Sequence, residues 1–243
     1  FILSHSSPTS LCPQTSILPM PLLKHITLPH FRFALWEIEE TEEELLSMLP
    51  SSLRQHYDQQ LQTLKHNRRR TEWLAARVVT HHCMCITTPI SYHENGCPFL
   101  EGCTLHISLS HSRNRIAVAI AEHPVGVDIE FITERAYRLR SRFLTPEEQV
   151  KMSFAPNNTD ETSGCVWAWS AKEAAFKYFS QTKPLKLLTD ICLTEVKGNI
   201  ITLQSVHKDV CSAAVFTHDG FAIAVTLNKD TTTTCENLLR AFQ

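Results

Sequence analysis

Two segments in the second half of the chain constrain its fold most strongly. Asp128 and Glu130 lie two positions apart in a β-branched run. Side chains two apart in a strand point to the same face of a sheet, so the two carboxylates should lie together. Residues 164–179 are rich in helix formers, and Glu173 and Lys177 are one helical turn apart within them. The sequence therefore predicts a strand and a long helix that both carry charged side chains.

Three carboxylates from two elements are typical of a site for a hard divalent cation. Mg²⁺ takes few protein carboxylates and leaves its remaining positions to water and substrate phosphates. Asp128, Glu130 and Glu173 are therefore candidate metal ligands. The alternative is a solvated strand acid beside a surface ion pair of Glu173 with Lys177, which would contribute only ~0.3–0.5 kcal/mol.

Composition excludes several classes of protein. The chain has 243 residues, 43% hydrophobic and 20% charged, which suits one large or two small globular domains. A net charge of −2 argues neither for nor against a nucleic-acid partner, and we expect none. No run approaches the ~20 apolar residues of a membrane span. The nine cysteines form no CxxC pair, so we expect free thiols in a reducing cytoplasm.

Alternation and helix signals predict a mixed α/β chain. Thr41 and Glu44 have the spacing of a capping box, and Pro146 follows Thr145 as expected at a helix start. Further helices are predicted at 53–64, 71–79, 133–142 and 164–179, with a loop at 157–164. Strands are predicted at 31–38, 104–108, 116–121, 125–131, 191–196, 200–206, 210–217 and 221–227.

These elements divide into two halves. We expect an N-terminal half at 21–124 and a C-terminal half, carrying the metal site, at 125–229. Residues 1–20 have no basic start and are broken by prolines, which predicts a disordered leader before an initiator at Met20. Residues 230–243 are expected to be a polar, dispensable tail.

Three short motifs follow one another along the chain in an order typical of one protein family. Ser110-His111-Ser112 precedes Gly126-Val127-Asp128-Ile129-Glu130, and a segment reading W-S-x-K-E-A-x-x-K follows at 169–177. Over roughly residues 31–228 the chain resembles the 4′-phosphopantetheinyl transferases, in particular the long, two-half type that activates surfactin synthetase. The resemblance implies an α/β (α+β) fold of two similar halves related by a pseudo-twofold axis, each an antiparallel sheet packed with helices.

The resemblance also implies a reaction. Members of the family transfer 4′-phosphopantetheine from coenzyme A to a carrier-protein serine, with Mg²⁺ as cofactor, and so convert the apo carrier to the holo form. The partner would be an acyl, peptidyl or polyketide carrier protein, as in fatty-acid biosynthesis, and the enzyme a cytoplasmic monomer. The alternative is a module that binds coenzyme A or a carrier without turnover.

The family assigns roles to the matching residues. The resemblance makes Glu173 the base, a metal ligand, or both, and Lys177 a stabiliser of phosphate charge. It places His111 at the pyrophosphate with Ser110 donating beside it. Lys172 is a supporting candidate, although it lies about 100° around the helix from Glu173.

Basic residues upstream are candidates for the 3′-phosphate of coenzyme A. Arg70 and Arg77 are seven positions apart and share a helix face if the helix begins early enough. Guanidinium groups suit phosphate. A solvated basic helix start is the alternative.

Other features remain open at this stage. Gly96-Cys97-Pro98 replaces the Gly-Lys-Pro of many relatives, a loss of charge for which Arg113 or Arg115 could substitute. Glu148 either supports the metal site or only places a favourable negative charge at a helix N-terminus. The run from His81 to Cys85 offers zinc ligands but has no second ligand pair. A basic rim for an acidic carrier is expected from Arg135, Arg138, Arg140 and Arg142.

Overall fold

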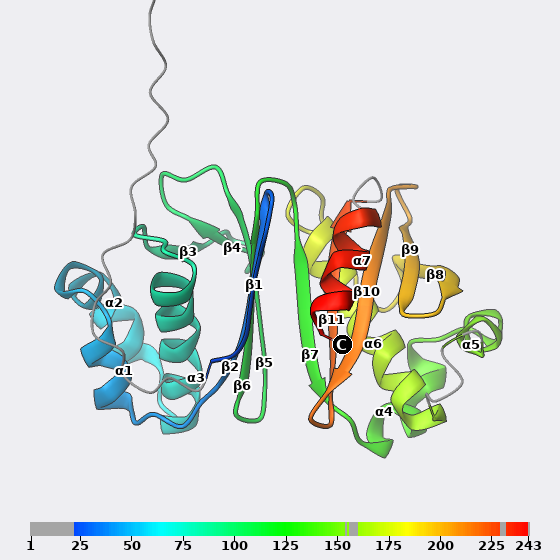
Figure 1. Ribbon diagram of the computed structural model, residues 1–243, viewed down its shortest axis with the longest axis horizontal. Coiled ribbons are helices and arrows are strands. Elements are labelled where there is room, and N and C mark those ends of the chain that lie inside the picture. Colours follow the sequence, from blue (N-terminus) through cyan, green and yellow to red (C-terminus); the bar gives the residue numbers. More distant parts are fainter. Residues whose placement is uncertain (1–21, 154, 156–159, 229–231, 243) are drawn as a thin grey trace, which may run out of the picture.

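A computed structural model describes residues 22–153, 155, 160–228 and 232–242. Figure 1 shows two sheets facing each other at the centre of the molecule, with helices on their outer sides. The expected leader at 1–20 lies outside the described residues. The predicted α/β fold with antiparallel sheets packed by helices is confirmed.

The first half contains a four-stranded antiparallel sheet in the order β1-β2-β6-β5. Its strands are β1 (Leu22–Leu28), β2 (Phe31–Glu37), β5 (His106–Ser112) and β6 (Arg115–Ala121), and a small hairpin is formed by β3 (Ile90–Tyr92) and β4 (Pro98–Leu100). Its helices are α1 (Glu42–Met48), α2 (Ser51–Thr63) and α3 (Asn67–Val78), which continues as a π-helical turn at Val79–Cys83. The predicted capping box of Thr41 and Glu44 starts α1.

The second half contains a five-stranded antiparallel sheet in the order β7-β11-β10-β9-β8. The strands are β7 (Gly126–Phe131), β8 (Ile191–Lys197), β9 (Ile200–Ser205), β10 (Val210–His218) and β11 (Phe221–Asn228). The helices are α4 (Glu134–Leu139), α5 (Pro146–Met152), α6 (Glu161–Phe179) and α7 (Thr232–Ala241). The loop predicted at 157–164 is wrong from Glu161 onward, because α6 begins there and the Asp160 side chain caps it by accepting from the backbone N–H of Ser163.

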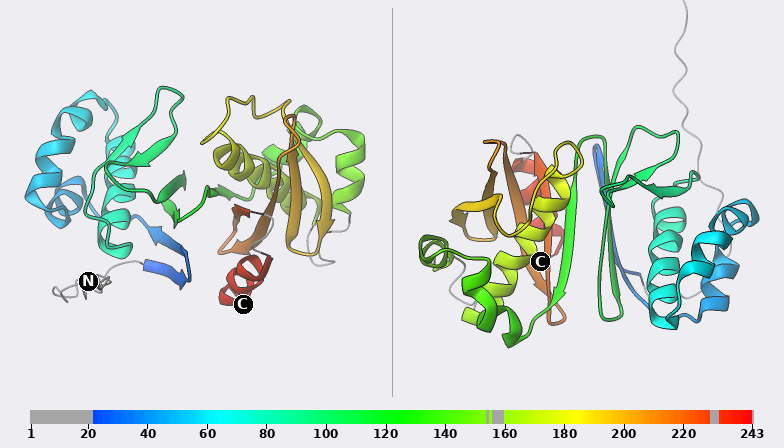
Figure 2. Two further views of the ribbon diagram at one scale, coloured as in Figure 1. Left: turned by 90° about the horizontal axis from the view of Figure 1, so that it is seen from above. Right: turned by 180° about the vertical axis from the view of Figure 1, so that it is seen from behind.

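Three apolar cores hold these layers together. One lies between α1–α3 and the first sheet, and another between α6 and the second sheet. The third lies between the two sheets, where Phe33 and Leu35 of β2 pack with Ile129 and Ile223 of the second sheet. Figure 2 shows this four-layer arrangement from above and from behind. The two halves therefore pack against each other through a shared apolar core.

The C-terminal segment differs from the predicted tail. Cys235 and Leu238 of α7 are fully buried in the core between the sheets, and the Phe242 ring stacks on Phe216 at 3.7 Å between centroids. The threonine run suggested a linker, but the apolar residues that follow it form a helix face that covers the side of this core. Residues 232–242 are therefore part of the fold.

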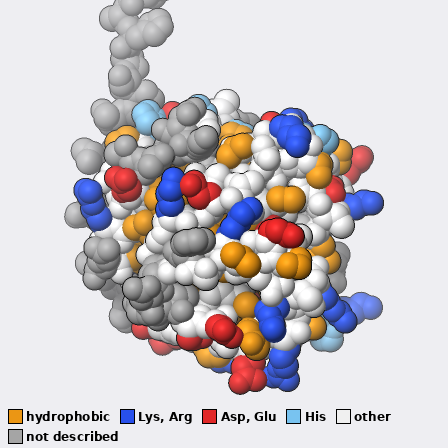
Figure 3. All heavy atoms as spheres, turned by 90° about the vertical axis from the view of Figure 1, so that its right-hand side faces the viewer, with side chains coloured by type: hydrophobic (Ala, Val, Ile, Leu, Met, Phe, Trp, Pro, Cys, Tyr) orange, Lys and Arg blue, Asp and Glu red, His pale blue; other side chains and the backbone are white. Residues whose placement is uncertain are grey.

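The surface is mixed in character. On the outer face of the second half, basic, acidic and hydrophobic side chains are interspersed (Figure 3). Among the described residues, no helix combines the length and the apolar character needed to cross a membrane. No disulfide joins cysteines within the described part of the chain.

Candidate functional site

A cavity of about 380 Å³ lies where the two halves meet, and we call it the junction cavity. Residues from α3, β5, α6 and the turn before β4 line it. The charged and reactive side chains among its lining residues are Arg69, Glu72, Arg77, Cys97, His111, Glu173 and Lys177. The structure therefore brings most of the predicted site residues to one place.

Alternate serines of β5 join the edges of the two sheets. The hydroxyl oxygens of this strand accept hydrogen bonds from backbone N–H groups of β7: Ser108 from Val127 at 2.9 Å, Ser110 from Ile129 at 3.3 Å, and Ser112 from Phe131 at 3.1 Å. Because every second side chain of a strand lies on one side, the serine spacing matches the pleat. These bonds position β7, and with it the acidic pair, beside His111.

Ser110 has a different partner from the one predicted. Its hydroxyl donates to Oδ1 of Asp128 at 2.9 Å, and the side chain is buried. A hydroxyl has one hydrogen to donate. Ser110 therefore uses it to hold Asp128 rather than to bind a phosphate.

A glycine sets the distance between β7 and α6. A Cβ atom on Gly126 would lie 1.8 Å from the backbone oxygen of Ala174, so only glycine allows this approach. As a result, Nζ of Lys177 donates to Oδ1 of Asp128 at 2.8 Å and to the backbone oxygen of Val127 at 3.0 Å. Lys177 therefore pairs across the two elements rather than with Glu173 on its own helix.

The three predicted metal ligands perturb one another. Burial and then the charge of Asp128 raise the pKa of Glu173 to about 7, and Glu130 adds to the effect. The same two leading causes raise the pKa of Glu130, whose Oε1 accepts from Nε1 of Trp169 at 3.3 Å. The carboxylates lie within electrostatic reach of each other, and their negative charge is only partly offset by Lys177.

This arrangement fits a divalent cation in its chemistry. Oδ2 of Asp128 is buried and has no hydrogen-bond partner among the described residues, so one carboxylate lone pair is free. Oxygen donors of this kind are the ligands that Mg²⁺ prefers. Among the residues described, however, no three His, Cys, Asp or Glu side chains are already drawn together into a metal-binding group. Asp128, Glu130 and Glu173 are thus neighbours with the right donors, and the first of them is held by Lys177 and Ser110.

His111 lies in β5 and lines the junction cavity. Its Nε2 is 2.7 Å from Nη1 of Arg69, and its Nδ1 is 3.6 Å from Oε2 of Glu72. Burial lowers the pKa of His111, while Glu72 raises it in part. Sequence reasoning missed both partners, although Arg69 belongs to the basic run that it singled out.

Arg77 is the most deeply buried cation at the cavity. It is 1% exposed, its guanidinium lies 3.2 Å from the ring centroid of Trp73, and its Nε has no partner among the described residues. Nη2 donates to the hydroxyl of Tyr92 at 3.5 Å. Among the described residues no carboxylate pairs with Arg77, so its positive charge is available to an anion in the cavity.

Arg70 does not line the junction cavity, and its role at the 3′-phosphate stays a prediction. Its Nε donates to Oε2 of Glu42 at 2.7 Å and its Nη1 to the backbone oxygen of Leu61 at 2.7 Å. These bonds tie α3 to α1 and to the end of α2. Arg69, one position earlier on the helix, lines the cavity instead.

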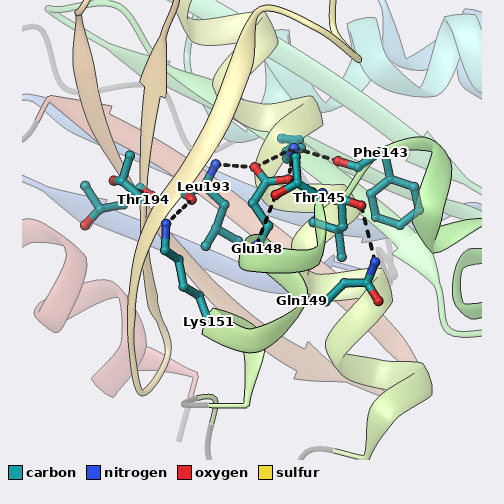
Figure 4. Close-up of polar contacts among 10 residues, drawn as sticks. Phe143, Thr145, Glu148, Gln149, Lys151, Leu193 and Thr194 are labelled. Carbon is teal, nitrogen blue, oxygen red and sulfur yellow. Dashed lines mark hydrogen bonds and ion pairs between the residues drawn. The ribbon is translucent and has the colours of Figure 1, made fainter.

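Lys172 and Glu148 are also structural rather than part of the cavity. The side chain of Lys172 is 3% exposed. Its Nζ lies 2.8 Å from Oε1 of Glu148 and donates to the backbone oxygen of Phe143 at 2.6 Å. Glu148 further accepts from the backbone N–H of Leu193 at 2.6 Å and completes a capping box with Thr145 (Figure 4). Lys172 therefore does not line the junction cavity, and its contact with coenzyme A stays a prediction. Glu148 joins α5, α6 and β8.

Cys97 lines the junction cavity and is buried, and burial raises the pKa of its thiol. The arginines proposed to replace the missing lysine lie elsewhere. The guanidinium of Arg113 stacks 3.2 Å from the ring centroid of Phe131, and Arg115 is 3.4 Å from Glu37. The cations that line the cavity are Arg69, Arg77 and Lys177.

The His81–Cys85 run is not gathered as a zinc site. The ring nitrogens of His81 are used by the hydroxyl of Tyr57 at 3.1 Å and the backbone oxygen of Ile86 at 2.6 Å. His81 and Cys83 are buried, whereas His82 and Cys85 are exposed. The four side chains therefore do not share one face.

Fold and site together define an α/β protein with a cavity lined by both basic and acidic side chains. A model of the 4′-phosphopantetheinyl transferase superfamily matches residues 124–226, which include β7 and α6. Through this region the chain is similar to that superfamily. Its two-sheet architecture agrees with the long type.

Curated relatives agree with this assignment. The chain is 32% identical over 85 residues to 4′-phosphopantetheinyl transferase gsp of Aneurinibacillus migulanus, covering 35% of each chain. It is 32% identical over 114 residues to AcpT of Salmonella typhimurium, covering 45% of this chain and 58% of AcpT. It is 26% identical over 143 residues to psf-1 of Bacillus pumilus, covering 56% and 61%. The matches thus span between about a third and three-fifths of these relatives' lengths.

Proposed function

We propose that this protein transfers the 4′-phosphopantetheine group of coenzyme A to a serine of a carrier protein. The observation that carries the proposal is the junction cavity itself, where Glu173 and Lys177 of α6 meet Asp128 of β7 within the segment that matches the superfamily. Unpaired positive charge on Arg77 and the Arg69–His111 contact on the opposite wall suit a phosphate-bearing substrate.

Glu173 is the proposed base. A carboxylate with a pKa of about 7 can accept a proton at neutral pH, and the serine hydroxyl must lose one to become an effective nucleophile. The serine oxygen forms a bond to the β-phosphorus of coenzyme A, and the bond from that phosphorus to the bridging oxygen breaks. The leaving group is 3′,5′-ADP, which carries away the bridging oxygen, while Glu173 keeps the serine proton.

Lys177 is proposed to stabilise charge on the reacting phosphates. Its ammonium group lies between β7 and the cavity and contacts Asp128 in the free protein. Asp128, Glu130 and Glu173 would hold Mg²⁺, which would supply positive charge to neutralise the pyrophosphate. Positively charged groups that face a developing phosphate charge lower the barrier to its transfer.

The carrier protein is proposed to dock beside α4. A second cavity of about 280 Å³ extends from Glu130 to Arg135 and Leu139, so an incoming serine could approach the acidic group from that side. Four arginines follow β7 and provide a basic rim for an acidic carrier: Arg135, Arg138, Arg140 and Arg142. Replacing Arg135 with Glu should raise the Michaelis constant for the carrier and leave that for coenzyme A unchanged. An unchanged carrier constant would contradict this docking side.

The carrier belongs to a fatty-acid, polyketide or peptide synthase, all of which use a phosphopantetheine arm. We further propose that the enzyme works as a cytoplasmic monomer, because both walls of the junction cavity come from one chain. Size-exclusion chromatography with light scattering would test the oligomeric state.

The decisive experiment combines the protein with coenzyme A, Mg²⁺ and an apo acyl carrier protein, and follows the carrier by intact mass. Addition of one phosphopantetheine is expected, and EDTA or Asp128→Ala should abolish it. Coenzyme A binding with no mass gain on any of several apo carriers would instead indicate a binding module without turnover. Cys97→Lys would then test whether the missing lysine limits the reaction.

A further inference from the structure

A buried carboxylate stands behind His111 on the wall of the junction cavity. Glu72 of α3 is 7% exposed, and its Oε1 accepts from Nε of Arg68 at 2.8 Å. Its other oxygen, Oε2, lies 3.6 Å from Nδ1 of His111. The second ring nitrogen of His111, Nε2, contacts Nη1 of Arg69 at 2.7 Å. The imidazole thus lies between the carboxylate of Glu72 and the guanidinium of Arg69.

These contacts fix the form of the ring in the free protein. A guanidinium group can only donate hydrogen bonds, so Nε2 of His111 must accept from Arg69. An imidazole whose Nε2 accepts is neutral and carries its hydrogen on Nδ1. That hydrogen faces Glu72, which is the nearest acid to Nδ1.

A phosphate in the cavity changes what this ring must do. Phosphate oxygens accept hydrogen bonds, so a ring that binds them needs a hydrogen on Nε2. Moving the single hydrogen from Nδ1 to Nε2 would leave a lone pair facing the carboxylate of Glu72. Only the imidazolium, with a hydrogen on each nitrogen, satisfies the phosphate and Glu72 together.

We propose that Glu72 is a positioning residue for His111. It orients the ring so that Nε2 faces the cavity, and it balances the charge of the imidazolium that forms when a phosphate of coenzyme A takes the place of Arg69 at Nε2. This inference rests on the proposed function, because it takes coenzyme A as the ligand. A consequence is that coenzyme A binds together with a proton.

The charges around His111 are consistent with the uptake of a proton when coenzyme A binds. Burial and the positive charges of Arg69 and Arg68 from α3 and of Lys177 from α6 lower the pKa of His111, and the charge of Glu72 opposes them. A bound phosphate adds negative charge against these cations. The pKa of the ring therefore rises on binding, and protons are taken up in the pH range between its free and bound values.

The test is titration calorimetry of coenzyme A into the protein, in buffers of different ionisation enthalpy at about pH 7.5, where a free imidazole of ordinary pKa is mostly neutral. The slope of the observed heat against buffer enthalpy gives the number of protons taken up. Relative to His111→Asn, the wild type should take up about one additional proton per coenzyme A. Glu72→Gln keeps a hydrogen-bond acceptor without the charge, and should lose this uptake and bind coenzyme A roughly tenfold more weakly.

Glu43→Gln, an exposed change on α1, is the matched control and should behave as the wild type. Equal proton uptake in Glu72→Gln and the wild type would overturn the inference while leaving the transfer reaction intact. If the wild type fails to bind coenzyme A, the proposed function fails. The same titrations with inorganic pyrophosphate then decide the inference: uptake that depends on Glu72 supports it, and absence of such uptake or of binding overturns it.

A spectroscopic measurement covers the case in which Glu72→Gln does not fold. The ¹⁵N shifts of His111 in the wild type distinguish the neutral Nδ1–H ring from the imidazolium. The neutral form is expected in the free protein and the imidazolium in the complex. A ring that stays neutral in the complex would overturn the inference.

Discussion

The hydroxyl of Ser110 donates to Oδ1 of Asp128 at 2.9 Å and accepts from the backbone N–H of Ile129 at 3.3 Å. One side chain of β5 thereby fixes both the position of an acidic residue and the backbone that follows it. Because the other half of the molecule supplies Asp128, this contact makes the acidic group depend on the packing of the two sheets.

Replacing Ser110 with Ala should therefore weaken the junction as well as the site. The variant leaves the N–H of Ile129 without its partner, which should lower the free energy of unfolding by about 1–3 kcal/mol. Ser112→Ala is the control, because Ser112 is only half-buried, and should cost less than about 1 kcal/mol. Urea denaturation measures both, and equal losses in the two variants would contradict the role assigned to Ser110.

Gly126 should tolerate no side chain. In Gly126→Ala the new Cβ would overlap the backbone oxygen of Ala174, so α6 must move away from β7. We expect a loss of about 3 kcal/mol or more in unfolding free energy, with transfer activity lost as Lys177 leaves Asp128.

Gly198→Ala is the matched control for Gly126→Ala. Gly198 has a φ of +58° but no atom within 4 Å of the added Cβ. It should cost only the backbone strain of about 1–2 kcal/mol and leave activity unchanged. Thermal unfolding and the carrier mass assay measure the pair, and a Gly126→Ala variant as stable and active as the wild type would contradict the close approach.

Local pattern was enough to predict which residues share an element. Alternation along β7 predicted that Asp128 and Glu130 lie on one face, and helical spacing placed Glu173 and Lys177 one turn apart. It could not predict that Lys177 pairs with Asp128, because that contact depends on how closely α6 approaches β7. The approach is set by Gly126, whose small size was not recognised as a signal.

Local sequence pattern could not predict which of the consecutive arginines lines the junction cavity, for a related reason. Neighbouring residues on a helix point about 100° apart, so Arg69 and Arg70 face different surroundings. Which one meets the cavity depends on the face of α3 that packs against the sheet. Glu72 was equally hidden, since a carboxylate in a basic helix start is ordinarily read as a surface ion pair. The apolar spacing of Leu238, Leu239 and Phe242 was a signal for α7 that the threonine run obscured.

Substituting Lys172 tests whether this residue stabilises the fold or contributes to coenzyme A binding. Lys172→Met leaves the carboxylate of Glu148 buried without its cation, which should cost about 3–5 kcal/mol of unfolding free energy. Adding Glu148→Gln removes that charge and should recover part of the loss. The coenzyme A affinity of the folded protein should not change, because Lys172 does not line the junction cavity.

Glu147→Gln, an exposed change beside Glu148, is the control and should leave stability within about 0.5 kcal/mol of the wild type. Chemical denaturation and calorimetry measure the two quantities. A large loss of coenzyme A affinity in folded Lys172→Met would show that Lys172 contributes to coenzyme A binding.

The raised pKa of Glu173 predicts how stability depends on pH in metal-free buffer. The folded protein holds the Glu173 proton up to about pH 7, whereas the unfolded chain releases it near its ordinary value of 4.5. A raised folded pKa contributes stability that is fully present below the unfolded value and is lost as pH rises through the folded value. The wild type should therefore lose this contribution between about pH 4.5 and pH 7.

Glu173→Gln should abolish that loss, since Gln cannot ionise, so the variant should gain in melting temperature relative to the wild type as pH rises from about 5 to about 8. Glu94→Gln, an exposed substitution, should show no such relative gain. If Mg²⁺ binds as proposed, adding it should stabilise the wild type at high pH more than Glu173→Gln, because the cation favours the ionised carboxylate. Parallel melting curves of wild type and Glu173→Gln at every pH would show that Glu173 ionises as an ordinary surface acid, and would remove the basis for assigning it the role of base.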